Sequence, residues 1–396
     1  MPAEIIVYGI GEQKVRLGSS IVYRKWTHPK TRPINGELVQ LVSRDGEYLA
    51  CGLWEEGTPV SARVLYSGVC EEGKAEDAIA RVLEESFEAR RRIGLIYRFD
   101  SYRLVNSDGD RLSGLIADVY GDVVVLQSSS PAIDKHLLRI ADQLASLTGA
   151  TNVFEKSIQR SRLDIGLKPV SRWIKGSRKE VIIEEGPVKF YVDVEKGQKT
   201  GFFLDQRFNR LEFGSLAGNG DAVLDVFSYT GGFGLHALAQ GARSVVFVEE
   251  DPTAVQVLKR NLRLNGFSDQ SAIILNESVW SLIDSGKLKR EFTLVAVDPP
   301  AFIQRGDRMN VSKGLRAYRR VFGWASSLVG IGVGYFSSCS YFLNRSRFLE
   351  LITRVLSRTS HQYRLYGDLR GAGPDHTLRG EEYLSYLKGA FVFIGS

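Results

Sequence analysis

The first part of the chain consists of short segments in which apolar and polar residues alternate, a pattern typical of half-buried β-strands. These segments cover residues 5–8, 38–43, 48–54 and 60–65, and Asn-Gly and Asp-Gly pairs between them are turn signals. Helical spacing does not persist there for more than a turn or two. The pattern therefore predicts a small β-barrel of five or six strands within residues 1–72.

Residues 73–183 mix the two kinds of periodicity. Apolar residues three and four apart predict helices over residues 74–92 and 131–146. Alternating segments bounded by Gly and Asp predict strands, which we place at residues 102–106, 115–120, 122–127 and 152–156. Residues 156–180 include eight basic and only two acidic residues, so this stretch is predicted to be a positively charged linker or sheet edge.

Strands and helices alternate regularly over residues 184–396. Continuous apolar segments predict buried strands at residues 222–226, 244–249, 294–298 and 332–337, with helices between them. This order predicts a doubly wound, mostly parallel α/β sheet, whose ligand lies beyond the carboxyl ends of the strands. The chain is therefore expected to be multi-domain, with a β-barrel, a central α+β domain and a C-terminal α/β domain.

Composition and charge narrow the class of protein. The 396 residues are 43% apolar and 25% charged, which are ordinary globular proportions, and the net charge is +6. No apolar stretch reaches the roughly 18 residues of a membrane span, and the start lacks a secretory pattern, so a cytoplasmic protein without membrane contact is expected. The three cysteines, Cys51, Cys70 and Cys339, show no metal-ligand spacing, and we expect neither a disulfide framework nor a metal site.

Three predicted strands end in an acidic residue. Asp225 is followed by a turn with Gly231, Gly232 and Gly234, Glu249 ends the next strand, and Asp298 precedes two prolines. The glycines do not follow the dinucleotide-binding G-x-G-x-x-G spacing, which disfavours nicotinamide cofactors.

Each of these motifs also has a purely structural interpretation. The glycines can serve a turn with positive φ, the acid after the second strand can lie in solvent at a helix N-terminus, and two prolines can simply end a strand. Their joint occurrence at the ligand-binding edge of one sheet favours a site, in which Glu249 accepts hydrogen bonds from ribose hydroxyls.

Taken together, these motifs resemble those of class I S-adenosylmethionine-dependent methyltransferases, with residues 276–280 as the adenine-side loop. More narrowly, residues 199–207 and 227–232 are similar to signatures of the ribosomal RNA large-subunit methyltransferase family that makes 5-methylcytosine. Residues 1–70 resemble its RNA-binding PUA domain, residues 73–183 its central domain, and the tail from Asp375 to Gly389 its C-terminus.

The resemblance implies S-adenosyl-L-methionine as cofactor, RNA and in particular rRNA as partner, and a homodimer as a plausible assembly. The residues it places at the cofactor are Gln206, Arg207, Asp225, Phe227, Ser228, Gly231, Glu249, Glu277, Ser278 and Asp298. Gln206 and Arg207 precede the first strand of the sheet, so only the resemblance assigns them to the cofactor.

The chemistry of cytosine methylation singles out Cys339. Cytosine C5 becomes nucleophilic only after a thiolate has added to C6. Cys339 follows the strand after the Asp298 motif and matches the family's Ser-Cys-Ser position, whereas Cys51 and Cys70 are expected to be buried structural residues. Asp298 is expected to bind the N3 and amine edge of the base. Another group of RNA cytosine methyltransferases has a second cysteine where Ala301 stands here, so the base that removes the C5 proton is unidentified.

Candidate RNA contacts lie in two places. Six basic residues and one acid occur between Arg305 and Arg320, as expected for a phosphate-gripping loop beside the cleft or for a solvated basic helix. In the barrel, Lys25 and Trp26 could contact RNA, although Trp26 could equally belong to the core. The candidate RNA-binding residues are Lys25, Trp26, Arg305, Arg308 and Lys313.

Two other functions stay open. Related domains with an Asp-Pro-Pro loop methylate guanine or adenine nitrogens without a thiolate, and an RNA-binding assembly factor could carry a vestigial methyltransferase domain. Of the histidines, His236 is expected to pack beside the glycine loop, and His376 could serve the cleft.

Overall fold

The computed structural model describes residues 2–71, 73–268, 270–289, 291–359, 362–378 and 384–395. The chain divides into two compact units, and each is assembled from separate stretches of sequence. Unit 1 comprises residues 1–183, 192–204 and 374–384, and unit 2 comprises residues 184–191, 205–373 and 385–396. The predicted barrel and central domain thus both belong to unit 1.

The barrel region of unit 1 is a six-stranded sheet with the order β2-β6-β5-β4-β1-β3. Strands β1 and β4 pair in parallel, and the other neighbours pair antiparallel. Its elements are β1 (Ala3–Val7), α1 (Ile10–Arg16), β2 (Ile21–Tyr23), the 3₁₀ turn η1 (Arg24–Trp26), β3 (Thr27–Pro29), β4 (Leu38–Val42), β5 (Tyr48–Trp54) and β6 (Val60–Ser67). The predicted strand count is confirmed.

A disulfide between Cys51 and Cys70 corrects the expectation that the chain contains none. Cys51 lies in β5, which pairs antiparallel with β6, and the chain after β6 returns past β5. The two Cα atoms are therefore 4.9 Å apart although the cysteines are 19 residues apart in sequence. Sequence spacing alone carries no information on this distance, because it depends on the register of the two strands. Both cysteines are buried, as expected.

The central region of unit 1 is a five-stranded sheet with the order β11-β10-β9-β8-β7, flanked by two long helices. Its elements are α2 (Ala75–Arg92), α3 (Leu95–Arg98), β7 (Ser101–Asn106), η2 (Ser107–Asp110), β8 (Leu115–Tyr120), β9 (Val123–Ser128), α4 (Pro131–Thr148), β10 (Asn152–Ser157), α5 (Arg160–Leu163) and β11 (Val170–Lys175). The basic stretch after Lys156 includes β11, which forms an edge of this sheet. Of the two predicted alternatives, a linker and a sheet edge, the sheet edge is therefore the correct one.

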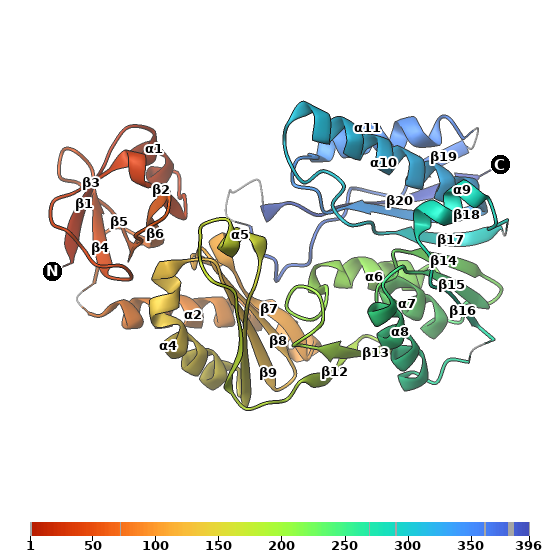
Figure 1. Ribbon diagram of the computed structural model, residues 1–396, viewed down its shortest axis with the longest axis horizontal. Helices are drawn as coiled ribbons and strands as arrows, with labels where there is room; N and C mark the ends of the chain where they lie inside the picture. Colours follow the sequence, from red (N-terminus) through yellow and green to blue (C-terminus); the bar gives the residue numbers. More distant parts are fainter. Residues whose placement is uncertain are drawn as a thin grey trace. The chain divides into compact units, whose positions relative to one another are not determined.

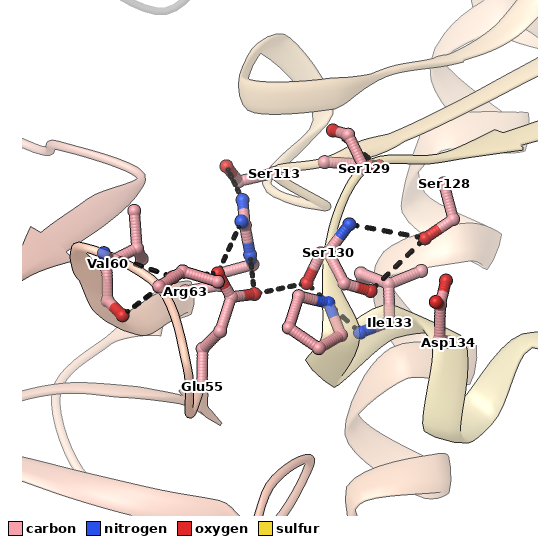
Figure 2. A network of polar contacts seen from close by, with 12 residues as sticks. Glu55, Val60, Arg63, Ser113, Ser128, Ser129, Ser130, Ile133 and Asp134 are labelled. Carbon is pink, nitrogen blue, oxygen red and sulfur yellow. Dashed lines mark hydrogen bonds and ion pairs between the residues drawn. The ribbon is translucent and has the colours of Figure 1, made fainter. Parts of the chain in front are cut away.

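A buried ionic network joins the barrel to the central region (Figure 2). The Arg63 guanidinium donates to Glu55 Oε1 at 2.8 Å and to Ser113 Oγ at 2.8 Å, and the Ser130 hydroxyl at the start of α4 donates to the Glu55 carboxylate. Burial alone would raise the pKa of Glu55, but Arg63 and the hydroxyl donors outweigh it and lower the pKa. These contacts fix the two regions to each other within unit 1.

Unit 2 is built on a seven-stranded sheet with the order β16-β15-β14-β17-β18-β20-β19, shown from green to blue in Figure 1. Strands β16, β15, β14, β17 and β18 are parallel, and β20 lies antiparallel between β18 and β19. The strands are β14 (Ala222–Val226), β15 (Ser244–Val248), β16 (Ala272–Leu275), β17 (Phe292–Val297), β18 (Val329–Ser338), β19 (Gln362–Leu365) and β20 (Lys388–Gly395). The four predicted strands are confirmed.

The helices of unit 2 connect these strands. They are α6 (Arg207–Ser215), preceded by the 3₁₀ turn η3 (Leu204–Gln206), then α7 (Gly232–Ala239), α8 (Pro252–Leu264), α9 (Val279–Ser285), α10 (Arg308–Ser327) and α11 (Arg345–Leu356). A two-stranded sheet, β12 (Glu180–Glu185) with β13 (Val188–Asp193), forms where the chain divides between the units. One large apolar cluster from strands and helices forms the core of unit 2.

Candidate active site

The loop after β14 has an unusual backbone. Phe227, Tyr229 and Gly231 have φ values of 62°, 49° and 92°, in the left-handed region that costs energy for residues other than glycine. A Cβ at position 231 would lie 2.4 Å from the Leu258 side chain, so both the conformation and the packing require glycine there. The Ser228 amide holds the loop by donating to the Val248 carbonyl at 3.1 Å.

Asp225, at the end of β14, is buried beneath this loop. Its Oδ2 accepts a hydrogen bond of 2.8 Å from the amide of Gly234 in α7. Burial, together with the neighbouring charges of Asp298 and Glu249, raises the pKa of Asp225 to about 7. The carboxyl group thus fixes the start of α7, and its contact with a cofactor stays a prediction.

Glu249 directly follows β15, and its side chain contacts the same loop. Its carboxylate accepts hydrogen bonds from the amides of Tyr229 at 2.7 Å and Asp251 at 2.9 Å, and burial raises its pKa. The loop with the predicted adenine-side residues lies next to it, because Asn276 donates to the Glu249 carbonyl at 2.9 Å. In that loop, Glu277 is exposed and Ser278 occupies the N-cap position of α9.

Asp298 follows β17 and is held from two sides. Its Oδ1 accepts from the Gln206 amide at 2.8 Å and from the hydroxyl of Ser337 in β18. Burial raises the pKa of Asp298 to about 6. The structure therefore brings together Gln206 and Asp298. The family resemblance alone assigned Gln206 to this site, whereas Asp298 was also assigned by its position at the end of a strand.

Arg207 lies in a cluster that sequence reasoning missed. Glu185 is completely buried and accepts from Arg207 at 3.2 Å, from Arg210 at 2.6 Å and from His236 at 3.0 Å, if the His236 tautomer carries its proton on Nε2. His236 packs within this cluster close to the glycine loop, in agreement with its predicted position. Arg207 thus has a structural partner, and its contact with the cofactor stays a prediction.

Cys339 directly follows β18 and is half-buried. Its two neighbours are anchored by Tyr318 of α10, whose hydroxyl lies 2.8 Å from Ser338 Oγ and 2.7 Å from Ser340 Oγ. Ser340 Oγ in turn accepts from the amide of Ile303, in the loop after Asp298, at 3.2 Å. Hydroxyl groups therefore tie the Cys339 segment to the Asp-Pro-Pro loop.

The basic segment after residue 305 is helical for most of its length, so the second alternative, a basic helix, describes it better than a loop. Arg305 precedes the helix, and Arg308 and Lys313 lie in its first turns, all three exposed. Of these three residues, Arg308 lines a cavity of about 460 Å³, together with Arg319 and Arg347.

The barrel candidates form a small pair on unit 1. The Lys25 ammonium lies 5.3 Å from the centre of the Trp26 ring, and Trp26 packs edge-on against Tyr8 at 6.3 Å. Lys25 is exposed and Trp26 half-buried, so Trp26 is only partly a core residue. His376 belongs to unit 1, where it contacts Asp375 at 3.0 Å. Glu382 and Tyr383 of the predicted tail motif lie outside the described residues.

Comparison with known proteins decides the family. Residues 110–339, more than half of the chain, match the S-adenosylmethionine-dependent methyltransferase family, and residues 5–66 match the PUA-like domain. The chain belongs to this family of methyltransferases. Ribosomal RNA large subunit methyltransferase I of Aeromonas salmonicida is 31% identical over 366 residues, which cover 91% of each chain. The resemblance to the large-subunit rRNA type is thereby confirmed.

Two solved structures share the fold of this methyltransferase. A methyltransferase complexed with SAH has a TM-score of 0.81 at 20% identity, and a SAM-dependent methyltransferase from Streptococcus mutans has a TM-score of 0.78 at 19% identity. Each alignment covers 99% of this chain and 100% of the other.

The cofactor of the family is S-adenosylmethionine, and the residues present fit it. A half-buried acid after the second strand suits ribose hydroxyls, and the strained glycine loop lies against this acid, because the Tyr229 amide donates to the Glu249 carboxylate. Partly buried rings adjoin the loop, with Phe302 centred 6.1 Å from Phe227 and 5.6 Å from Trp280, and such rings suit a flat base.

Among the described residues, no cluster of three or more His, Cys, Asp or Glu side chains is arranged to hold a metal ion. No helix in the described ranges has the length and apolar character needed to cross a membrane.

Proposed function

We propose that this methyltransferase forms 5-methylcytosine in large-subunit rRNA and that Cys339 is its nucleophile. The observation that carries the proposal is the position of Cys339. It follows β18 at the same sheet edge where Asp298 follows the neighbouring parallel strand β17, and Ser337 bonds to Asp298 across these strands. A thiol and a half-buried carboxyl group at adjacent strand ends are the pair that cytosine C5 methylation needs.

The residues would act in sequence on the base. The Cys339 thiolate adds to C6, and the electron pair of the C5–C6 double bond makes C5 nucleophilic while Asp298 binds the N3 and amine edge. S-adenosylmethionine, when bound, supplies an electrophilic methyl group. Loss of the C5 proton then restores the double bond, and the C6–S bond breaks to release the thiolate. Gln206 and Ser337 keep Asp298 in place through the hydrogen bonds described above.

Large-subunit rRNA is proposed as substrate on three grounds. The relative from Aeromonas salmonicida carries that substrate in its name, and residues 5–66 form a PUA-like domain. The cavity lined by Arg308, Arg319 and Arg347 follows the Asp-Pro-Pro loop in sequence and offers guanidinium groups suited to phosphates. A role on ribosomal RNA agrees with the expected cytoplasmic location.

Transfer of labelled methyl groups to unmodified rRNA tests the proposal, with identification of the modified nucleoside by mass spectrometry. We expect labelled 5-methylcytidine from the wild-type protein and none from Cys339→Ala, which should still bind S-adenosylmethionine. A Cys51→Ala/Cys70→Ala variant is the matched control and should retain transfer below its melting temperature. A methylated purine, or full transfer by Cys339→Ala, would contradict the proposed mechanism, and failure to bind the cofactor would favour the assembly-factor alternative.

A further inference from the structure

A buried lysine lies beside the proposed nucleophile. Lys388 begins β20, and its register partner on β18 is Ser338, the residue before Cys339. The Lys388 ammonium donates to the carbonyl of Ser340, the residue after Cys339, at 2.7 Å and to the Tyr386 carbonyl at 2.5 Å. Lys388 is only 1% exposed. Its charged end is therefore held at the backbone that carries Cys339.

Burying an ammonium group without a carboxylate is costly, so such a lysine calls for an explanation. In the described part of the chain, the Lys388 ammonium bonds only to the two backbone carbonyls, and no carboxylate pairs with it. Burial lowers the pKa of Lys388 to about 8, while the charge of Cys339 acts in the opposite direction. A thiol has an ordinary pKa of about 8.5, so the two groups have similar affinities for a proton.

We propose that Lys388 accepts the proton of the Cys339 thiol and stays beside it as the ammonium counter-ion of the thiolate. In this step the S–H bond breaks and an N–H bond forms, so that a neutral thiol and a neutral amine become a thiolate and an ammonium with no change in net charge. Lys388 is thus a positioning residue that acts through Cys339. The inference rests on the proposed function, because it takes Cys339 as the nucleophile.

The other charged and titratable groups around this pair are less suited to the task. Tyr318 of α10 is bonded to Ser338 and Ser340, and burial raises its pKa to about 12. Arg345 of α11 acts electrostatically on Lys388, and a guanidinium does not release or accept a proton in this pH range. Asp298 is the remaining rival acceptor, and its carboxyl group is already bonded to Gln206 and Ser337.

The rate of alkylation of the Cys339 thiol tests the inference without RNA or cofactor. Iodoacetamide reacts with thiolates, and the disulfide leaves Cys339 as the reactive cysteine when no reductant is present. The rate is followed from pH 5 to 10, and peptide mass spectrometry confirms the labelled residue. We expect the wild-type rate to reach half its maximum below the ordinary thiol pKa of about 8.5. In Lys388→Met the rate at pH 7 should fall about tenfold, which corresponds to a thiol pKa one unit higher.

Two further variants separate charge from structure. Lys388→Arg supplies a cation that cannot accept the proton, so it should recover only the counter-ion contribution, which is a lower thiol pKa. Lys259→Met removes an exposed lysine of α8 and should change nothing. Thermal melts identify variants that fail to fold. If Lys388→Met does not fold, the wild-type profile alone decides, because a half-maximal rate at or above the ordinary thiol value would overturn the inference.

Other outcomes also decide. An unchanged profile in folded Lys388→Met would overturn the inference, as would a loss of rate in Asp298→Asn with none in Lys388→Met. Because alkylation needs no substrate, failure of the proposed function has a separate signature: a methylated purine product together with a thiol profile that still depends on Lys388.

Discussion

Replacing Glu185 by glutamine removes the negative charge on which two buried guanidinium groups depend. Arg207 and Arg210 are almost completely buried, and both donate to the Glu185 carboxylate, as does His236 in the appropriate tautomer. Glutamine keeps the size of the side chain but removes the carboxylate charge to which both guanidinium groups bond. Breaking a buried pair in this way costs about 3–5 kcal/mol.

The expected loss is large enough for a simple assay. A domain of about 150–250 residues loses roughly 2–4 °C in melting temperature per kcal/mol, so the transition of unit 2 should fall by about 10 °C. Glu184→Gln is the matched control, because the Glu184 carboxylate is exposed and its ion pair with Lys189, at 3.3 Å, lies at the surface. That variant should stay within about 0.5 kcal/mol of the wild type in urea unfolding.

The pH dependence gives a second readout with a defined sign. Burial alone would raise the pKa of Glu185, but Arg210 and His236 outweigh it and hold the pKa well below its usual range. Below the ordinary glutamate pKa of about 4.3, the unfolded chain therefore binds a proton at Glu185 before the folded chain does. The stability contributed by Glu185 is present above that pH and is lost as the pH falls further. The difference in free energy of unfolding between wild type and Glu185→Gln should thus be constant from about pH 8 to 5 and should become smaller in acid. A difference below about 1 kcal/mol at neutral pH would refute this account of the cluster.

Three further predictions concern the disulfide, the glycine loop and the arginine cavity. Reduction of Cys51–Cys70, or its replacement by two alanines, should destabilise the barrel region by about 3 kcal/mol, the loop-closure value for a separation of 19 residues, measured by urea unfolding with and without reductant. Gly231→Ala should weaken S-adenosylmethionine binding in calorimetry at least tenfold and lower the melting temperature, because residue 231 has φ 92° and no room for a Cβ. Arg319→Ala/Arg347→Ala should reduce the slope of log affinity for rRNA against log salt by about 1.4–1.8, if each arginine neutralises one phosphate.

These predictions have clear negative outcomes. Equal unfolding midpoints with and without reductant would mean that the disulfide does not constrain the unfolded chain. Wild-type cofactor affinity in Gly231→Ala would show that the loop can relax. Gly220→Ala, at a residue with φ 98° but open space around it, is the control for backbone strain without a clash. An unchanged salt slope in the double arginine variant would remove the cavity from the RNA path.

The sequence predicted the placement of those candidate site residues that lie at the end of a strand. Asp225 lies at the end of its apolar strand, and Glu249 and Asp298 directly follow theirs, so topology alone assigns them to one edge of the sheet. Cys339 could be selected in the same way, with the chemistry of cytosine as a second criterion.

Side chains that meet across long sequence separations could not be predicted. Glu185 contacts Arg207, Arg210 and His236, which lie 22, 25 and 51 residues later in the sequence. No local sequence pattern predicts these contacts. The disulfide was missed for the same reason, and Lys388 was included only within a family-like tail. In each case the contact depends on how strands and helices pack, which periodicity does not encode.

The position of β20 has a consequence for how this protein is made. Residues 388–395 form an inner strand, paired on one side with β18 and on the other with β19. Residues 374–384 belong to unit 1, so unit 1 lacks part of its chain until residue 384 has left the ribosome, and unit 2 lacks β20 until residue 395 has followed. Domains that fold during synthesis ordinarily do so from the N-terminus onward. Here the edge of β18 that pairs with β20 stays unpaired until residues 388–395 are available. A nascent chain stalled before residue 388 would therefore expose a strand edge that favours aggregation.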